Sequence, residues 1–243
     1  MPDPIQSLCE QGQAALLATD YLAAERHLVA AEELAWDADH FDALARLYMP
    51  LQEARRQRRQ TCGDGVFASV IARSPSDEID ADALAERHPR GQLIVAGFGS
   101  IGPAANLRAI AAQRGLYLDL PLAAAYDVGG QATVLIVPTA DVAPPPAEKV
   151  GSIDALLRLA PPHSVVVPAA ALPPDQPRGD SATFGYAMSL WETLHGPFLG
   201  LADSTMDPRQ KLIAYRQTIR VDYACEFAHQ RFSQTARLLS RRR

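Results

Sequence analysis

The chain has 243 residues, 48% of them hydrophobic and 21% charged, which is typical of a folded globular protein. Its net charge of -5 argues against nucleic-acid binding as the main function, because phosphate recognition needs a concentrated excess of Lys and Arg. The arginines at positions 55, 56, 58, 59 and 241–243 fall at expected helix C-termini, where the helix dipole favours cations.

The N-terminal sequence has no basic stretch followed by an apolar core, and no run of about 18 apolar residues occurs in the chain. We therefore expect a cytoplasmic protein with no membrane partner. Cys9, Cys62 and Cys225 are odd in number and widely spaced, with no Cys-x-x-Cys motif. This pattern predicts free thiols rather than a disulfide framework or a cysteine zinc site.

Residues 5–36 predict two helices in an antiparallel hairpin. Small and large side chains alternate as they do in closely packed helix pairs, at Leu8, Gly12, Ala15, Tyr21, Ala24, Leu28 and Ala31. Thr19 and Asp20 can cap the second helix. A third helix over residues 38–60 should lie against the hairpin and kink at Pro50.

This hairpin resembles a tetratricopeptide repeat, with Gly12, the Asp20-Tyr21 turn, Ala24, Leu28 and Ala31 at the spacings of that family. The resemblance covers one unit of about 34 residues, the period of the repeat. Trp36 stands where the family usually has proline, and no second repeat follows. A lone repeat cannot cover its own apolar face. The resemblance implies a protein partner that binds through the N-terminal helices.

Short apolar runs in the middle of the chain predict buried strands at Val66–Ala72, Leu93–Ala96, Ala132–Val137 and Ser164–Val167. Helical patterns fall between them, at 77–88, 103–114 and 153–159. The alternation predicts an α/β fold with a short, mostly parallel sheet of four or five strands, right-handed crossovers and helices on both faces. Proline-rich passages at 138–151 and 168–180 should be surface connections, the second a domain boundary.

From Ser181 the pattern is helical again. A helix over 183–195 should stop at Gly196-Pro197, and a long final helix should run from Asp207-Pro208 to about Leu239. The apolar arc of this last helix is wide, which indicates burial against several neighbours. We therefore expect three parts: helical residues 1–61, an α/β core at 62–172, and C-terminal helices at 181–243 that pack with the N-terminal ones.

The segment Gly97-Phe98-Gly99-Ser100-Ile101-Gly102 follows a buried strand and opens a helix. It resembles the dinucleotide-binding fingerprint of Rossmann proteins, with Asp119 about 20 residues on at the ribose-binding position. The resemblance implies an NAD(P) or other nucleotide site formed by Gly97, Gly99, Ser100, Gly102 and Asp119. Asn106 and Pro103 depart from the pattern, and a glycine turn that binds nothing is the alternative.

Two Glu-x-x-His pairs, Glu192/His195 and Glu226/His229, lie on expected helices, with Asp222 on the arc of the second. The spacing resembles ferritin-like di-iron sites, which also need a single Glu from each of two other helices. Coincidence or helix-surface salt bridging explains the pairs better than a metal site does, and we expect no metal. Cys225 and His229 could form a thiol–imidazole pair, although a buried helical Cys is usually inert packing.

Two functions remain open. In the first, the protein is a non-catalytic interaction or scaffold protein whose N-terminal helices form a groove for a protein partner. In the second, it is a nucleotide- or NAD(P)-dependent enzyme that uses the Gly97–Gly102 loop. The first is favoured because no acid, base or nucleophile accompanies the glycines, and a fold resemblance does not supply a reaction.

Overall fold

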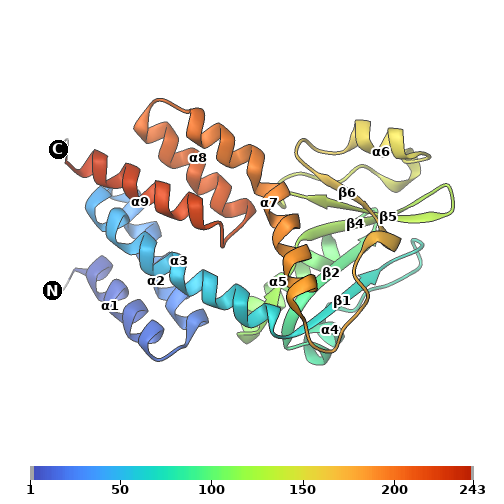
Figure 1. Ribbon diagram of the computed structural model, residues 1–243, viewed down its shortest axis with the longest axis horizontal. Coiled ribbons are helices and arrows are strands. Elements are labelled where there is room, and N and C mark those ends of the chain that lie inside the picture. Colours follow the sequence, from blue (N-terminus) through green and yellow to red (C-terminus); the bar gives the residue numbers. More distant parts are fainter. Residues whose placement is uncertain (1–2, 242–243) are drawn as a thin grey trace. The chain divides into compact units, whose positions relative to one another are not determined.

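The chain adopts an α/β fold with helices at both ends, shown here by a computed structural model that describes residues 3–241 (Figure 1). Arg242 and Arg243 of the C-terminal arginine cluster lie outside the described residues. Contacts divide the chain into a helical unit, Met1–Arg59 with His195–Arg243, and a sheet unit, Gln60–Leu194. Within residues 3–241, no helix combines the length and apolar character needed to cross a membrane.

The helices and strands are as follows. The helices are α1 Pro4–Leu17, α2 Tyr21–Asp37, α3 Phe41–Gly63, α4 Ala81–Arg87, α5 Gly102–Arg114, α6 Ile153–Leu159, α7 Ser181–Ser204, α8 Pro208–Val221 and α9 Glu226–Ser240, with short 3-10 turns at Ala147–Lys149 and Ala169–Ala171. The strands are β1 Val66–Ile71, β2 Arg90–Phe98, β3 Tyr117–Asp119, β4 Leu122–Val128, β5 Gln131–Val137 and β6 Val165–Pro168.

The sheet has the order β1-β2-β4-β5-β6, with the short β3 paired to β2. β2 pairs in parallel with β1, β3 and β4, whereas β4–β5 and β5–β6 are antiparallel. The expected α/β fold, with an open, mostly parallel sheet and helices at both chain ends, is confirmed, and the sheet includes β4, which the sequence did not predict. Gly129 and Gly130 both have positive φ and join β4 to β5 by a two-residue hairpin turn, which makes this pair antiparallel.

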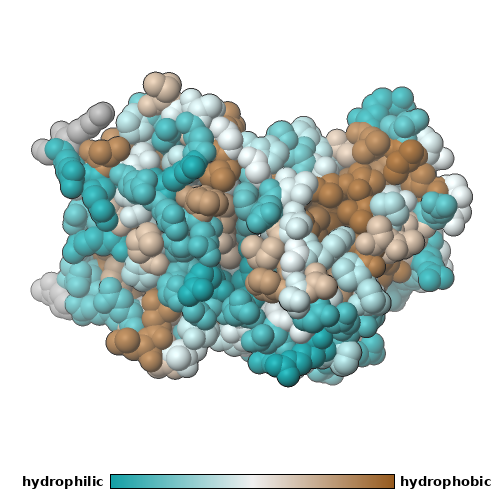
Figure 2. All heavy atoms as spheres, viewed as in Figure 1, coloured by the Kyte–Doolittle hydropathy of each residue, from teal (hydrophilic) through white to brown (hydrophobic). Residues whose placement is uncertain are grey.

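Helices cover both faces of the sheet. On one face, buried residues of α4, α5 and α6 pack on alternate strand residues, with Leu107 and Leu156 fully buried. On the other face, the first half of α7 lies over β1 and β2, where Tyr186 meets Phe67 edge to face. Hydrophobic side chains also gather on the surface near β6 and α6, where Ile153, Leu157 and Leu159 are exposed (Figure 2).

The helical unit has one core built from both chain ends. α1 and α2 form the expected hairpin, in which Gly12 lies directly against Leu28 and the Asp20 side chain accepts from the Ala23 N–H. Tyr48 of α3 stacks on Phe232 of α9 with ring centroids 3.7 Å apart. The blue and red helices in Figure 1 therefore share buried apolar surface.

Two expected helix boundaries in the C-terminal region were wrong. α7 continues through Gly196-Pro197, because tertiary contacts at His195 and the fully buried Ala202 hold the helix on either side of the proline. The expected single long helix is two helices, α8 and α9, separated at Asp222–Cys225. Asp222 has an extended backbone there, and its carboxylate accepts the Ala224 N–H, which breaks the helix.

Gly91 is required by the close approach of β1 and β2. A Cβ added at Gly91 would lie 2.4 Å from the Val66 carbonyl oxygen, which belongs to the paired strand. We predict that Gly91→Ala lowers the free energy of unfolding by about 1–3 kcal/mol, the usual cost of overpacking. Gly185→Ala is the matched control, since a Cβ on this exposed helical glycine meets nothing within 4 Å.

The control should instead raise stability, by about 0.5–1 kcal/mol, because Ala is the better helix former. Denaturant unfolding of both variants measures the two changes. Equal signs for the two substitutions would contradict the account of the β1–β2 contact.

Candidate functional site

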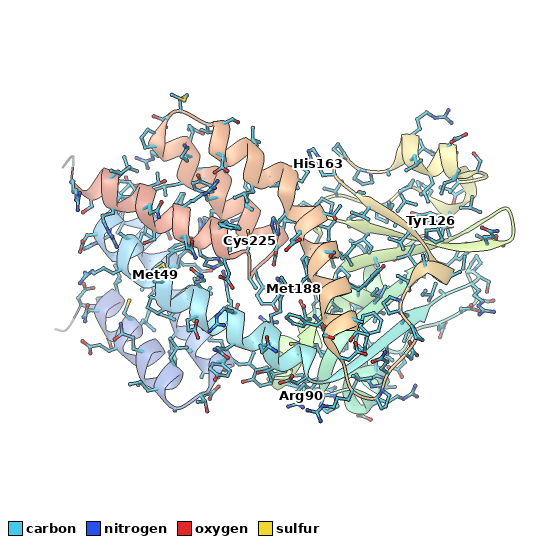
Figure 3. All side chains as sticks on the ribbon, in the orientation of Figure 1. Met49, Arg90, Tyr126, His163, Met188 and Cys225 are labelled. Carbon is cyan, nitrogen blue, oxygen red and sulfur yellow. The ribbon has the colours of Figure 1, made fainter. Side chains whose placement is uncertain are left out.

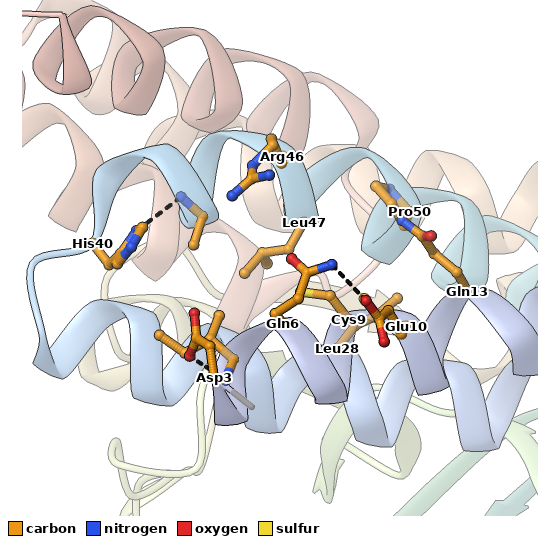
Figure 4. A pocket seen from close by; sticks show the side chains of 12 residues that line it. Asp3, Gln6, Cys9, Glu10, Gln13, Leu28, His40, Arg46, Leu47 and Pro50 are labelled. Atoms are coloured by element: carbon orange, nitrogen blue, oxygen red, sulfur yellow. Dashed lines mark hydrogen bonds between the residues drawn. The ribbon is translucent and has the colours of Figure 1, made fainter. Parts of the chain in front are cut away.

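A groove lies in the helical unit between α1 and the beginning of α3. It encloses a cavity of about 110 Å³, with the buried Leu28 of α2 between its walls (Figure 4). The walls are formed by Asp3, Ile5, Gln6, Cys9, Glu10 and Gln13 on one side and His40, Ala43, Arg46, Leu47 and Pro50 on the other. The groove thus has an apolar floor and polar rims that come from two different helices.

The groove is held in shape by caps and local bonds. The Asp3 carboxylate accepts from the Ile5 N–H at the beginning of α1, and His40 Nδ1 accepts from the Ala43 N–H at the beginning of α3. Asp3 and His40 lie at the same end of the groove in Figure 4. Gln6 donates to Glu10 along α1. Arg46 forms an exposed ion pair with Asp42, which is weak because solvent screens it. Its guanidinium therefore costs little to redirect toward a bound group.

Cys9 lies on the α1 wall of the groove. Burial raises the pKa of its thiol, and only the nearby Arg46 opposes this effect. The thiol is therefore protonated at neutral pH and is a poor nucleophile. The groove suits recognition of a side chain better than covalent chemistry.

The glycine loop forms the turn that the sequence predicts, between β2 and α5. Its N–H groups, however, bond within the protein: Gly99 donates to the Ala125 carbonyl (2.8 Å), Ser100 to that of Gly97 (3.1 Å), and Gly102 to Ser100 Oγ (3.0 Å). Pro103 has no N–H, and its ring lies 2.8 Å from where a Cβ of Gly97 would be. Three N–H groups of the turn, those of Gly99, Ser100 and Gly102, therefore already have partners within the protein.

The proline-rich passage after β5 packs on the same loop. A Cβ added at Gly99 would lie 3.0 Å from the Ala147 Cβ, so this passage occupies the space in front of the turn. Gly99 also has φ +60°, a conformation that favours glycine for local reasons alone. The glycines at 97 and 99 are thus explained by packing, and nucleotide binding at this loop stays a prediction.

Asp119 lies at the end of β3, where the resemblance to Rossmann proteins put it, but it is buried. One of its carboxylate oxygens accepts from Gln92 Nε2 (3.3 Å) and from the indole N–H of Trp191 (3.2 Å). Gln92 is its partner across the β2–β3 pair, and Trp191 comes from α7. Asp119 therefore contacts Trp191 of α7 and Gln92 of β2, and not the glycine loop.

In each Glu-x-x-His pair, the two side chains lie in different environments. Glu192 and Glu226 are exposed, whereas His195 and His229 are buried. His229 contacts the Cys225 carbonyl through Nδ1 and Arg55 through Nε2. The carboxylates and imidazoles therefore do not combine into the di-iron arrangement, and Cys225 meets His195 rather than the His229 side chain.

A buried polar cluster forms instead around Asp222, which contacts His195 Nδ1 at 2.7 Å and Arg59 Nη2 at 2.6 Å. Among the described residues, His195, Asp222 and Cys225 are the one group of at least three His, Cys, Asp or Glu side chains whose ligand atoms all lie within 4.8 Å of one another. Arg59 already neutralises the carboxylate, so a cation placed there would meet a guanidinium charge. The arrangement suits a structural ion pair better than a metal centre.

The electrostatics of the cluster follow from burial and these contacts. Burial opposes ionisation of Asp222, but the charge of Arg59 and the bond to His195 outweigh it and hold the pKa well below its usual range. Burial also lowers the pKa of His195, yet hydrogen bonds to Asp222 and Cys225 raise it to about 9. Burial and the charge of Arg55 lower the pKa of His229 to about 3.

Sequence reasoning named Leu28 and expected a groove in the N-terminal helices but did not single out the polar residues of its rims, such as Gln6, Gln13 and Arg46. Gln6 and Gln13 are seven residues apart on α1, so a common helix face could have been inferred from the sequence. Arg46 had no such signal, because its place opposite α1 depends on how α3 packs. Comparison with known protein families, with characterised proteins and with solved structures found no match.

The packing of Ala147 on Gly99 can be measured with two glycine substitutions. Gly99 and Gly115 both have positive φ, but a Cβ at Gly115 would meet nothing within 4 Å. We predict that each change to Ala costs about 1–2 kcal/mol in backbone strain, and that Gly99→Ala costs more because Ala147 must move. Unfolding free energies give the comparison, and a smaller cost at Gly99 would refute the packing.

The His195–Asp222 pair predicts how stability depends on pH. Because the folded state raises the pKa of His195 from 6.5 to about 9, its contribution is complete below pH 6.5 and is lost as the pH rises through about 9. The melting temperature of the wild type should therefore fall between pH 6.5 and about 9, and the melting temperature of His195→Gln should fall less steeply over the same interval.

His229→Gln is the control for the pH series. Its pKa of about 3 places the proton change of the folded state far below the interval, so this variant should keep the wild-type slope whatever its absolute stability. Identical slopes in the wild type and His195→Gln would contradict the ion pair.

Proposed function

We propose that the protein is a non-catalytic interaction protein that binds a short segment of a partner protein in the groove between α1 and α3. The observation that carries the proposal is the groove itself, with a buried Leu28 at its floor and polar groups on both rims. Its volume of about 110 Å³ is well below the roughly 300–1,000 Å³ of small-molecule pockets, and it suits one side chain.

The chemistry of the groove indicates what the segment contains. An apolar side chain would occupy the space above Leu28, Ala43 and Leu47 and would be desolvated there. The side-chain amides of Gln6 and Gln13 can both donate to and accept from an extended peptide backbone. Arg46 can turn from the exposed Asp42 to a carboxylate of the partner. This division of roles follows the usual pattern of an apolar anchor inside a polar rim.

Catalysis is a weaker interpretation of the same chain. The side chains of Cys225, His195 and Asp222 would be the nearest approach to a nucleophile, a base and an orienting acid. All three are buried, and Arg59 holds the carboxylate. A substrate would have to reach a thiol in the interior of the helical unit.

The test is a groove-filling substitution in the full chain. The partner is first identified by replacing Gln13 with a photo-crosslinking residue in cells that make the protein naturally and analysing the crosslinked product by mass spectrometry. The purified partner is then titrated into the wild-type protein and its variants to measure affinity. Gln13 is exposed at the groove, so Gln13→Trp adds bulk without changing the core. We predict at least a tenfold loss of affinity, about 1.4 kcal/mol, because the ring covers the apolar floor.

Glu33→Trp is the matched control. Glu33 is exposed on α2 and does not line the groove, so the same added ring there should leave the affinity unchanged. Full binding by Gln13→Trp, or an equal loss in both variants, would contradict the proposal.

A further inference from the structure

A second, larger hollow lies in the sheet unit where β1 and β2 begin. Its volume is about 670 Å³, within the range of small-molecule pockets. Three separate segments line it: Asp64, Gly65 and Val66 at the start of β1, Arg87–Arg90 between α4 and β2, and Pro177-Arg178 in the connection before α7. We call this hollow the basic pocket.

The basic pocket concentrates positive charge in a chain whose net charge is -5. Two of the three segments bring arginines: Arg87 ends α4 and Arg90 opens β2 in one segment, and Arg178 follows Pro177 in another. Asp64 is the single carboxylate among the lining residues. The lower surface of the sheet unit is correspondingly hydrophilic in Figure 2, and Arg90 is labelled there in Figure 3.

These guanidinium groups are available to a ligand. Arg87, Arg90 and Arg178 are exposed, and across residues 3–241 none of the three belongs to an ion pair, although Arg90 donates to the Asp64 carbonyl (3.4 Å). The helix dipole accounts for Arg87 at the end of α4, but neither of the other two lies on a helix. Burial and then the charge of Arg87 lower the pKa of the adjoining His88, and the charge of Asp175 opposes them.

The backbone beneath the arginines is fixed by close contacts. The Gly179 N–H donates to the Gly65 carbonyl, and a Cβ at Gly179 would lie 2.3 Å from the Gly63 carbonyl oxygen. A Cβ at Gly65 would lie 2.4 Å from the Arg90 carbonyl oxygen. Pro89 and Pro177 restrict the backbone beside two of the arginines. The pocket is therefore organised before a ligand arrives, which lowers the entropic cost of binding.

We propose that the basic pocket binds a small ligand that carries two or more phosphoryl groups. Guanidinium groups pair with phosphate oxygens through two parallel hydrogen bonds, and three of them match the charge of a diphosphate. No Phe, Tyr or Trp lines the pocket, and His88 is the one aromatic ring among its lining residues, so charge dominates what the pocket offers a ligand. The phosphoryl groups are the part of the ligand that the pocket recognises.

Calorimetric titration of the full chain with inorganic pyrophosphate at constant ionic strength tests the proposal. Arg90→Gln and Arg178→Gln alter exposed side chains, so both should fold normally, and each should weaken binding about tenfold through the loss of a charged hydrogen bond. Arg158→Gln is the control, because Arg158 is exposed on α6 of the same unit and does not line the pocket.

The outcomes are distinct. Saturable pyrophosphate binding that weakens about tenfold in Arg90→Gln and in Arg178→Gln but is unchanged in Arg158→Gln supports the pocket. No binding at millimolar pyrophosphate, or equal weakening in all three variants, overturns it. Equal affinity for ADP and pyrophosphate supports recognition of the phosphoryl groups alone, whereas ADP binding without pyrophosphate binding overturns it. ADP binding that survives both arginine changes but is lost in Gly99→Ala would assign the ligand to the glycine loop instead.

Discussion

The Asp222 carboxylate is the contact on which the helical unit depends. The chain leaves this unit after Arg59 and re-enters it at His195, and Asp222 bonds both residues from the break between α8 and α9. All three side chains are almost fully buried. Removing one partner of such a buried pair typically costs about 3–5 kcal/mol, because the remaining charge is left uncompensated. The buried contacts of Asp222 with Arg59 and His195 therefore join the N-terminal and C-terminal segments of the helical unit.

The sequence predicted those elements whose structure depends on local residues alone. The helix at Ile153–Leu159 has the expected bounds, and the glycine turn after β2 forms as expected. β4 was missed because its alanine-rich run has no strand signal of its own. It becomes a strand because its fully buried alanines fit between β2 and β5, where tertiary packing overrides propensity.

Contacts between distant parts of the chain were beyond sequence reasoning. Asp119 was placed correctly at a strand end, but its bond to Trp191 requires knowledge of how α7 crosses the sheet. Asp222 and His195 were both noted, each with a helical neighbour, and the structure pairs them with each other and with Arg59. The groove and the basic pocket likewise combine residues from segments whose packing no periodicity reveals.

The sequence segment of the sheet unit comes between the two sequence segments of the helical unit, and this order has a consequence for synthesis. Because domains fold as units while the ribosome extends the chain, the N-terminal part of a protein ordinarily folds first. Here α1–α3 emerge early but lack Phe232, Asp222 and the rest of their core until translation is almost complete. The segment Gln60–Leu194 is available in full before then. The apolar face of α1–α3 thus stays exposed on the nascent chain during most of its elongation, and we expect chaperones to bind it in that period.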